Sequence, residues 1–367
     1  MDRTVLSIQS HVAHGYVGGR AATFPLQLLG WEVDVVNTVN FSNHSGYRRK
    51  PGEGRRSTGE ELTAIFKGLE MNGLLNPSRL LTGYTPNAEC LSAIATLINK
   101  LRSQNSKLVY LLDPVIGDNG RLYVAEDVIP LYRTMLSAAT IITPNWFEVE
   151  TLVGFKLDSR ATLQRAISTL HREYGVPHVV ISSIPVTPQR AAWLPVSFQG
   201  TTFDLAKEDI AYAAEGLLCL SSSLTDDSEE SIVHAAAIAQ IAGYYAGVGD
   251  LFSATVLGYY DPDGDNAEQA AAGATPLSVA VDKAIRTTHA ILRKTAKASI
   301  LAPGASEDGF TDEELDGKDE NRRPRRMRAR ELRLVGSADV ILGGGESLKG
   351  TPLCHSAMTR WKDFWTS

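Results

Sequence analysis

The chain has 367 residues, 43% of them hydrophobic, and a formal net charge of −6. This length allows one large or two ordinary domains with a sizeable core. The mild negative charge argues against nucleic acid or an acidic membrane surface as a partner. Three widely spaced cysteines, Cys90, Cys219 and Cys354, form no CxxC pair, which argues against a disulfide framework or a zinc site. No signal-peptide pattern opens the chain, so we expect a cytoplasmic protein.

Short β-rich runs alternate with helical patterns over the first half of the chain. Strands are predicted at 4–8, 31–39, 79–83, 107–115, 138–145 and 177–183, and helices at 20–30, 58–73, 87–104, 146–154 and 161–175. This alternation predicts βαβ units, and thus an α/β fold with a mostly parallel sheet covered by helices on both faces. From 190 to about 218 the pattern becomes antiparallel and β-like, and helices return at 249–260 and 276–298.

One apolar stretch, residues 235–260, is long enough to raise the question of a membrane span. Its single charged residue is Asp250, and a charge at the bilayer centre costs about 2.5–3.5 kcal/mol. We therefore expect no membrane partner, and interpret this stretch as core.

The motif "GVGD" comprises Gly247, Val248, Gly249 and Asp250 and precedes a helical run. Glycines let backbone N–H groups converge, and a helix N-terminus adds partial positive charge, so the motif predicts an anion cradle. A carboxylate inside a cradle for phosphate indicates a base that accepts a hydroxyl proton. The alternative is that Asp250 is a helix N-cap, worth about 1 kcal/mol.

Carboxylates also follow two predicted buried strands. Asp113 and Asp118 lie five residues apart in "DPVIGD", where Pro114 and Gly117 turn the chain, and they could face one cavity. Such oxygen ligands suit Mg²⁺ on nucleotide phosphates, although aspartates also cap loops. In "TPNWFE", Asn145 and Glu148 share a face of a helical first turn, as phosphate and metal contacts or as a helix cap.

The ends of the first two predicted strands carry hydroxyls, imidazoles and aromatic rings, in "SIQSHVAHGYVGGR" and "FSNHSGY". These groups could hold a small polar ring. His11 and His44 lack the neighbours of a metal site, so hydrogen bonding or stacking is favoured over metal ligation. No GxxxxGK[ST] P-loop or GxSxG elbow is present.

Two segments fit the α/β pattern poorly. Residues 302–330 are polar and charged and end in "NRRPRRMRAR", which favours a disordered surface insertion over a nuclear-localisation or nucleic-acid-binding patch. The tail, residues 343–367, has no periodicity and two tryptophans that we expect to be exposed. We expect one domain over 1–342 and leave the tail unassigned.

Taken in order, these motifs and the closing "ELRLVGSADVI" resemble the pyridoxal kinase family of the ribokinase-like superfamily. The resemblance implies a three-layer α/β/α fold with a small β and loop lid. It implies ATP-dependent phosphorylation of the 5′-hydroxyl of pyridoxal, pyridoxine and pyridoxamine, in vitamin B6 salvage. It also implies Mg²⁺, a monovalent cation such as K⁺, and a homodimer.

The resemblance assigns roles by position. Asp250 matches the family's base, and Gly247, Val248 and Gly249 its anion-hole loop. The vitamer pocket matches Ser10, Val17, Phe41, His44, Ser45 and Tyr84. The metal and phosphate region matches Asp113, Asp118, Glu148 and Thr143, and nucleotide and cation contacts match Thr143, Asn145, Ser182 and Ser183.

The chain departs from the family pattern at three places. Val248 stands where a threonine is usual, Ser182 replaces a usual threonine, and "RRKPGEGRR" at 48–56 replaces an aromatic-Lys-Gly lid segment. The lost hydroxyl at Val248 predicts weaker nucleotide or phosphate binding, since a hydrogen bond to a charged group is worth about 1.5–3 kcal/mol. The alternatives to a pyridoxal kinase are a hydroxymethylpyrimidine or sugar kinase and a non-catalytic vitamer-binding pseudokinase.

Overall fold

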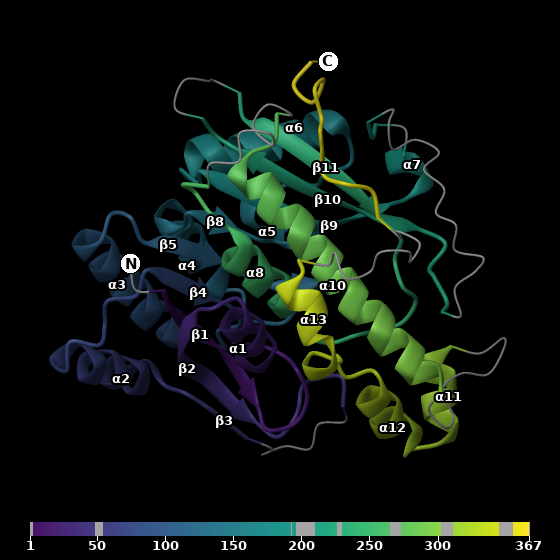
Figure 1. Ribbon diagram of the computed structural model, residues 1–367, viewed down its shortest axis with the longest axis horizontal. Helices are drawn as coiled ribbons and strands as arrows, with labels where there is room; N and C mark the ends of the chain where they lie inside the picture. Colours follow the sequence, from purple (N-terminus) through teal and green to yellow (C-terminus); the bar gives the residue numbers. More distant parts are fainter. Residues whose placement is uncertain are drawn as a thin grey trace.

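The computed structural model describes residues 3–47, 54–191, 193–195, 210–225, 230–264, 273–301, 311–344 and 355–366. Figure 1 shows a twisted sheet crossed by helices, with the long helix α10 (Pro276–Ile300) running over one face. Within these residues, no helix is both long and apolar enough to span a membrane. The apolar stretch at 235–260 divides into the end of a strand, a loop and a helix.

The central sheet has ten strands in the order β12-β11-β10-β9-β8-β5-β4-β1-β2-β3. Its middle part is parallel, as the alternating pattern predicts. The parallel strands are β1 (Thr4–Val12), β2 (Glu32–Phe41), β4 (Arg79–Thr82), β5 (Val109–Leu112), β8 (Ile141–Ile142) and β9 (His178–Val186). The mostly parallel α/β fold class is therefore confirmed.

Antiparallel strands extend the sheet at both edges. At one edge, β3 (Gly54–Arg56) pairs with β2. At the other, β10 (Gly216–Ser223), β11 (Ile232–Ile238) and β12 (Thr359–Arg360) follow β9 in antiparallel register. The antiparallel region thus begins near the end of the predicted interval, and residues 196–209 of that interval lie outside the described part of the chain.

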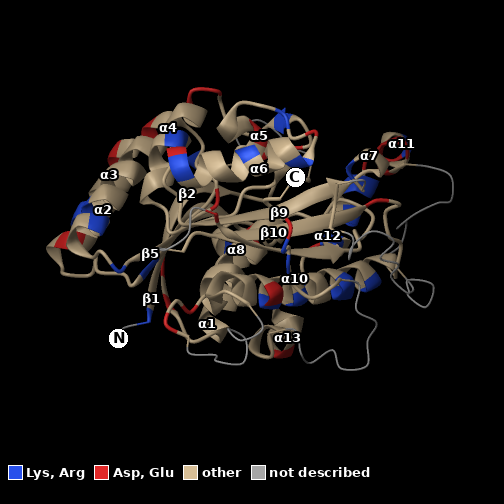
Figure 2. Ribbon diagram, turned by 90° about the horizontal axis from the view of Figure 1, so that it is seen from above, with Lys and Arg blue, Asp and Glu red and all other residues tan. Residues whose placement is uncertain are grey.

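Helices cover both faces of the sheet, and Figure 2 shows the resulting three layers. One layer holds α2 (Gly59–Met71), α3 (Ala88–Gln104), α4 (Val128–Met135), α5 (Trp146–Val153) and α6 (Arg160–Ser168), which a π-helical turn extends to Glu173. The other holds α1 (Gly19–Leu28), α8 (Val248–Tyr259), α10 and α13 (Ala338–Leu342). Each layer has its own apolar cluster against the sheet.

The structure adds elements that the sequence patterns did not predict. Among them are α4, the short helix α7 (Pro188–Ala191) and the hairpin formed by β6 (Gly117–Asp118) and β7 (Arg121–Leu122). These elements are short, so they carry little periodicity.

The charged segment at 302–330 is not disordered where the structure describes it. Residues 311–330 contain α11 (Asp312–Lys318) and α12 (Arg322–Ala329), while 302–310 lie outside the described residues. The prediction of disorder was wrong here because it rested on the number of charged residues and did not consider that they form ion pairs with one another. Asp312 and Asp316 lie four residues apart on α11 and meet arginines at the same spacing on or just after α12, namely Arg322, Arg326 and Arg330.

The tail is also anchored where it is described. Trp361 and Phe364 are buried against the cluster that covers α6, and Trp365 is half-buried, so the expectation of two exposed tryptophans was wrong. The backbone N–H of Trp361 donates to the carbonyl oxygen of Val233 in β11 at 2.9 Å. Residues 345–354 of the tail lie outside the described part.

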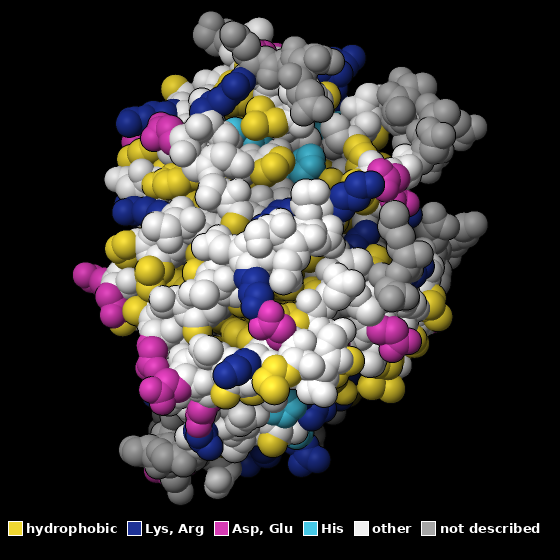
Figure 3. All heavy atoms as spheres, turned by 90° about the vertical axis from the view of Figure 1, so that its left-hand side faces the viewer, with side chains coloured by type: hydrophobic (Ala, Val, Ile, Leu, Met, Phe, Trp, Pro, Cys, Tyr) yellow, Lys and Arg dark blue, Asp and Glu magenta, His cyan; other side chains and the backbone are white. Residues whose placement is uncertain are grey.

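Charge is mixed on the side of the molecule that Figure 3 presents. Basic and acidic side chains are interspersed there with hydrophobic ones, so the visible described residues form no broad patch of one sign.

Candidate active site

The "GVGD" motif forms the N-terminus of α8, as its glycines predict. Gly247 is the residue that precedes the helix, with φ of 78°, and a Cβ there would stand 1.8 Å from the carbonyl oxygen of Tyr16. Only glycine fits this close approach between α8 and the turn before α1. Gly249, in contrast, has nothing within 4 Å of where a Cβ would stand. The loop is thus packed against Tyr16 at Gly247 and has free space beside Gly249.

Asp250 lies in the first turn of α8 and is not its N-cap, a position that Gly247 occupies without a side-chain bond. The N-cap alternative was therefore wrong. The carboxylate instead accepts a hydrogen bond from the backbone N–H of Gly18, across the turn that precedes α1. Burial raises the pKa of Asp250, which this hydrogen bond partly offsets. A carboxyl group with a raised pKa is a better proton acceptor at neutral pH.

Asp113 follows β5 and is buried among hydroxyl groups. Its Oδ2 accepts a 2.8 Å hydrogen bond from Ser253, whose hydroxyl also lies 2.9 Å from the hydroxyl of Thr143. Burial, and next the charge of Asp250, raise the pKa of Asp113 to about 7. Asp113 and Asp250, 137 positions apart in the printed sequence by the difference of their numbers, therefore interact at one edge of the sheet.

Glu148 and Asn145 form the capping box of α5, the alternative that the sequence left open. Asn145 accepts from the N–H of Glu148 at 2.9 Å, and Glu148 accepts from the N–H of Asn145 at 2.8 Å. The other carboxylate oxygen of Glu148 accepts from the N–H groups of Ile116 and Gly117 at 2.9 and 3.3 Å. Glu148 therefore ties the "DPVIGD" turn to α5. Burial and the charge of Asp113 raise its pKa well above the usual range.

The predicted metal ligands do not form a protein cage. Among the described residues, no three His, Cys, Asp or Glu side chains are grouped as ligands of one ion. Asp118 accepts two hydrogen bonds from the adjacent Asn119, at 2.8 and 3.1 Å. This geometry nevertheless fits Mg²⁺, which keeps several waters and needs only one or two carboxylates beside nucleotide phosphates.

The predicted nucleotide contacts sit beside this acidic region. The amide side chain of Asn145 donates to the carbonyl oxygen of Gly117 at 2.8 Å. The backbone N–H of Ser182, in the middle of β9, donates to the carbonyl oxygen of Pro144, just after β8, at 2.9 Å. Ser182 and Ser183 are both half-buried, and Thr143 is buried.

Part of the predicted vitamer pocket is built around Ser10, near the end of β1. A Cβ on Gly18 would stand 2.2 Å from the Ser10 hydroxyl, so the turn that contains Val17 lies directly on Ser10. Since Gly18 also donates to Asp250, Ser10 and the candidate base both contact the same turn. Phe41, at the end of β2, and Tyr84, after β4, are half-buried.

His44 is buried, and both of its ring nitrogens have protein partners. The N–H of Gly46 donates to Nδ1 at 3.1 Å, and Nε2 lies 2.9 Å from Oε1 of Glu331. The hydrogen bonds of the His44 ring are therefore made to the protein and not to a ligand. A bound ring would contact the imidazole by packing. The neighbouring Ser45 is exposed and hydrogen-bonds Tyr244.

Three residues near these groups were not predicted from the sequence. Ser253 is three positions after Asp250 on α8, so helical periodicity places it on the same side and would have found it. Tyr244 interacts electrostatically with Asp118 and Asp250 and bonds Ser45, but it precedes the motif in a loop without periodicity. Glu331 is 287 residues from His44, and no local pattern indicates this contact.

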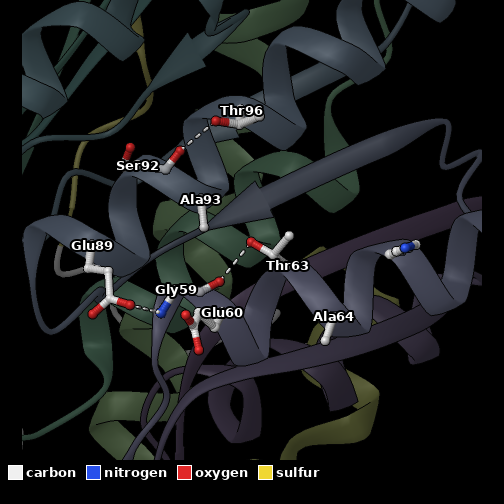
Figure 4. Close-up of a pocket in the computed structure, with 9 residues that line it drawn as sticks. Gly59, Glu60, Thr63, Ala64, Glu89, Ser92, Ala93 and Thr96 are labelled. Carbon is white, nitrogen blue, oxygen red and sulfur yellow. Dashed lines mark hydrogen bonds between the residues drawn. The ribbon is translucent and has the colours of Figure 1, made fainter.

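A separate groove lies between α2 and α3 (Figure 4). Its volume is about 510 Å³, and small or polar side chains line it. Within it, the N–H of Gly59 donates to Oε1 of Glu89 at 2.9 Å. None of the predicted site residues lines this groove.

Comparison with known proteins decides the family. Over 308 residues, 82% of this chain and 88% of its relative, the chain is 37% identical to the pyridoxal kinase of Homo sapiens. The chain belongs to the pyridoxal kinase family. The family's enzyme from Arabidopsis thaliana is 37% identical over 298 residues, 79% of this chain and 82% of that protein.

Solved pyridoxal kinase structures have the same fold. The enzyme from Leishmania donovani in complex with ADP and pyridoxamine aligns with a TM-score of 0.70 and 31% identity, over 98% of this chain and 99% of that one. A family model described as phosphomethylpyrimidine kinase matches residues 75–240. The ribokinase-like fold that the sequence motifs implied is therefore confirmed, and the chain is a kinase-family protein.

Proposed function

We propose that this chain transfers the γ-phosphoryl group of ATP to the 5′-hydroxyl of pyridoxal, pyridoxine and pyridoxamine. The observation that carries the proposal is the position of Asp250 at the N-terminus of α8. This carboxylate has a raised pKa and follows Gly249, which has no neighbour within 4 Å of where a Cβ would stand. Family membership supports the substrates, because the Leishmania donovani pyridoxal kinase binds ADP with pyridoxamine.

In the proposed reaction, Asp250 accepts the proton of the vitamer hydroxyl. A bond forms between that oxygen and the γ-phosphorus while the bond from the γ-phosphorus to the β–γ bridging oxygen breaks, and ADP leaves with the electron pair. The N–H groups at the start of α8 stabilise the charge on the transferred group, with the helix dipole adding to them. Gly18 holds the base in place through its hydrogen bond.

Asp113 and Asp118 would hold Mg²⁺ through its bound waters, with Thr143 beside them. When bound, the metal neutralises phosphate charge. Burial of Asp113 supports this assignment, because burial and the charge of Asp250 raise the pKa of Asp113, and a bound cation would offset both effects. We assign Glu148 to holding the turn that carries Asp118, and Asn145, Ser182 and Ser183 to nucleotide or K⁺ contacts.

The remaining assignments rest on the family resemblance. We propose that the protein is a homodimer and that K⁺ supports turnover, and a cytoplasmic location stays a prediction. Sedimentation velocity tests the dimer, where a monomer at working concentration would contradict it.

A coupled ADP-release assay with each vitamer, with and without K⁺, tests the activity. We expect phosphorylated vitamer with Mg·ATP, and Asp250→Ala should lower kcat by about 10²–10⁴-fold. Asp34→Ala, which changes an exposed aspartate on β2, is the matched control and should leave turnover unchanged. An Asp250→Ala variant that keeps normal turnover would exclude this base.

The same assay tests the two alternatives. The match of residues 75–240 to the phosphomethylpyrimidine kinase model supports including hydroxymethylpyrimidine in the substrate panel, together with a sugar. Preference for either over the vitamers would contradict the proposal. Tight pyridoxal binding without ATP turnover would indicate a vitamer-binding pseudokinase.

A further inference from the structure

Glu331 joins two turns of the candidate vitamer pocket from the far end of the chain. Its Oε1 lies 2.9 Å from Nε2 of His44 and accepts a 2.9 Å hydrogen bond from the Tyr47 hydroxyl. Its Oε2 accepts from the backbone N–H of Tyr16 at 3.0 Å. Glu331 is only 7% exposed, so these hydrogen bonds form away from bulk water. One carboxylate therefore fixes the turn before α1 and the turn after β2.

These contacts determine which nitrogen of His44 carries the proton. The N–H of Gly46 donates to Nδ1, so Nδ1 is an acceptor and carries no hydrogen. The proton of the neutral ring is then on Nε2, which donates to Glu331. The N–H of Gly46 thus selects the tautomer, and Glu331, as the acceptor at Nε2, fixes the orientation of the imidazole.

The arm that carries Glu331, residues 311–331 with α11 and α12, is also held by contacts that do not involve His44. Arg323 donates to the carbonyl oxygen of Gly46 at 2.8 Å. The sulfur of Met327 lies so close to Gly46 that a Cβ there would stand 2.6 Å from it. The α12 helix therefore covers the turn between His44 and Tyr47.

Close packing on the other side leaves little freedom for Glu331. Gly15 has φ of 97°, and a Cβ on it would stand 2.6 Å from Oε1 of Glu331. A glycine is needed at this position both for its backbone conformation and for the approach of the carboxylate.

We propose that Glu331 is a positioning residue that sets vitamer binding by holding His44 in one orientation and by joining the turns at Tyr16 and Tyr47. This inference rests on the proposed function, because it assigns His44 to the wall of the vitamer pocket. Glu331 itself does not take part in phosphoryl transfer.

Kinetics of Glu331→Ala test the role in binding. We expect KM for pyridoxal to rise about tenfold or more, since a misplacement of about 1 Å can cost on the order of 10²-fold. KM for Mg·ATP should stay unchanged, and Glu331→Gln, which keeps one acceptor oxygen, should lie between the two proteins. Glu313→Ala changes an exposed glutamate of the same arm and should match wild type.

A double-mutant cycle separates this role from a general loss of structure. If Tyr47 acts through Glu331, Tyr47→Phe raises KM for pyridoxal in the wild-type background and adds nothing in Glu331→Ala. Unchanged KM for pyridoxal in Glu331→Ala, or equal losses toward pyridoxal and Mg·ATP, would overturn the proposal.

A third measurement needs no turnover. In protein labelled with ¹⁵N in the histidine rings, His44 should show a protonated Nε2 and an unprotonated Nδ1. In Glu331→Ala the Nε2 proton loses its acceptor, so its resonance should shift and its exchange with water should become faster. Absence of activity toward every vitamer would refute the proposed function, whereas an unchanged Nε2–H resonance and exchange rate of His44 in Glu331→Ala would refute the role of Glu331.

Discussion

The hydroxyl of Ser253 donates a 2.8 Å hydrogen bond to Oδ2 of Asp113 and so joins α8 to the end of β5. The helix that begins with the glycine loop is thereby fixed to the strand that carries the candidate metal carboxylate. Both residues are buried, so water does not readily replace the bond if it is removed.

We expect Ser253→Ala to lower the free energy of unfolding by about 1–3 kcal/mol, because a buried carboxylate loses its donor. Urea denaturation measures this change. Ser221→Ala is the matched control, since the buried Ser221 hydroxyl on β10 has no hydrogen-bond partner among the described residues. Equal losses in the two variants would contradict a specific role for the Ser253 bond.

The raised pKa of Asp113 predicts a pH dependence of stability without metal or nucleotide. Its pKa is about 7 in the folded protein and lower when unfolded, so the folded state binds the extra proton between these values. Stability should therefore fall as pH rises from about 4 to about 7 through this group. Asp113→Asn should flatten this part of the melting-temperature profile in chelated buffer, whereas an identical slope in both proteins would exclude Asp113 as the cause.

Glu148 offers a test of structural against metal-binding roles. Because its carboxylate accepts from three backbone N–H groups, Glu148→Ala should destabilise the protein by about 3 kcal/mol or more even in metal-free buffer. Glu126→Ala, at an exposed glutamate before α4, should change the unfolding free energy little. A normal unfolding curve for Glu148→Ala would instead favour a role confined to the metal.

Val248 tests whether a hydroxyl at the anion loop strengthens binding. Its side chain packs beside the cluster around Leu251, and Val248→Thr keeps the shape while adding a donor. We expect KM for Mg·ATP to fall about tenfold or more, as a hydrogen bond to a charged group is worth about 1.5–3 kcal/mol. Val248→Ala adds no donor and should not lower KM, and an unchanged KM in Val248→Thr would show that the hydroxyl does not reach the phosphates.

Local patterns predicted most of the parallel half of the fold, because its strands are short apolar runs and its longer helices are periodic, whereas the short helix α4 was missed. The capping box of α5 and the glycines before α8 were also visible as short motifs. Arrangements that depend on pairing were not visible. The charges of α11 and α12 are typical of a disordered segment in the sequence alone, and only the fold shows ion pairs such as that of Asp312 with Arg330. The position of the tail likewise depends on the pairing of β12 with β11.

The candidate site also has features that the sequence predicted and features that it did not. The carboxylates after β5 and at α8 follow from strand ends of a parallel sheet, where ligands bind. The hydrogen bonds to both ring nitrogens of His44 could not be predicted in this way, since one partner is two residues away in the sequence and the other is 287 residues away. Sequence spacing identified which residues gather, whereas the hydrogen bonds that decide their roles required the folded chain.

The distance along the chain between His44 and Glu331 also bears on how the protein is made. Most strands of the sheet and most helices on its two faces precede residue 302, but the turn at His44 gains its carboxylate only from position 331. A nascent chain that has folded its sheet on the ribosome therefore carries an unfinished pocket. Competence to hold a vitamer would arrive with the last part of translation, and a premature stop before Glu331 would release a chain whose His44 lacks that anchor.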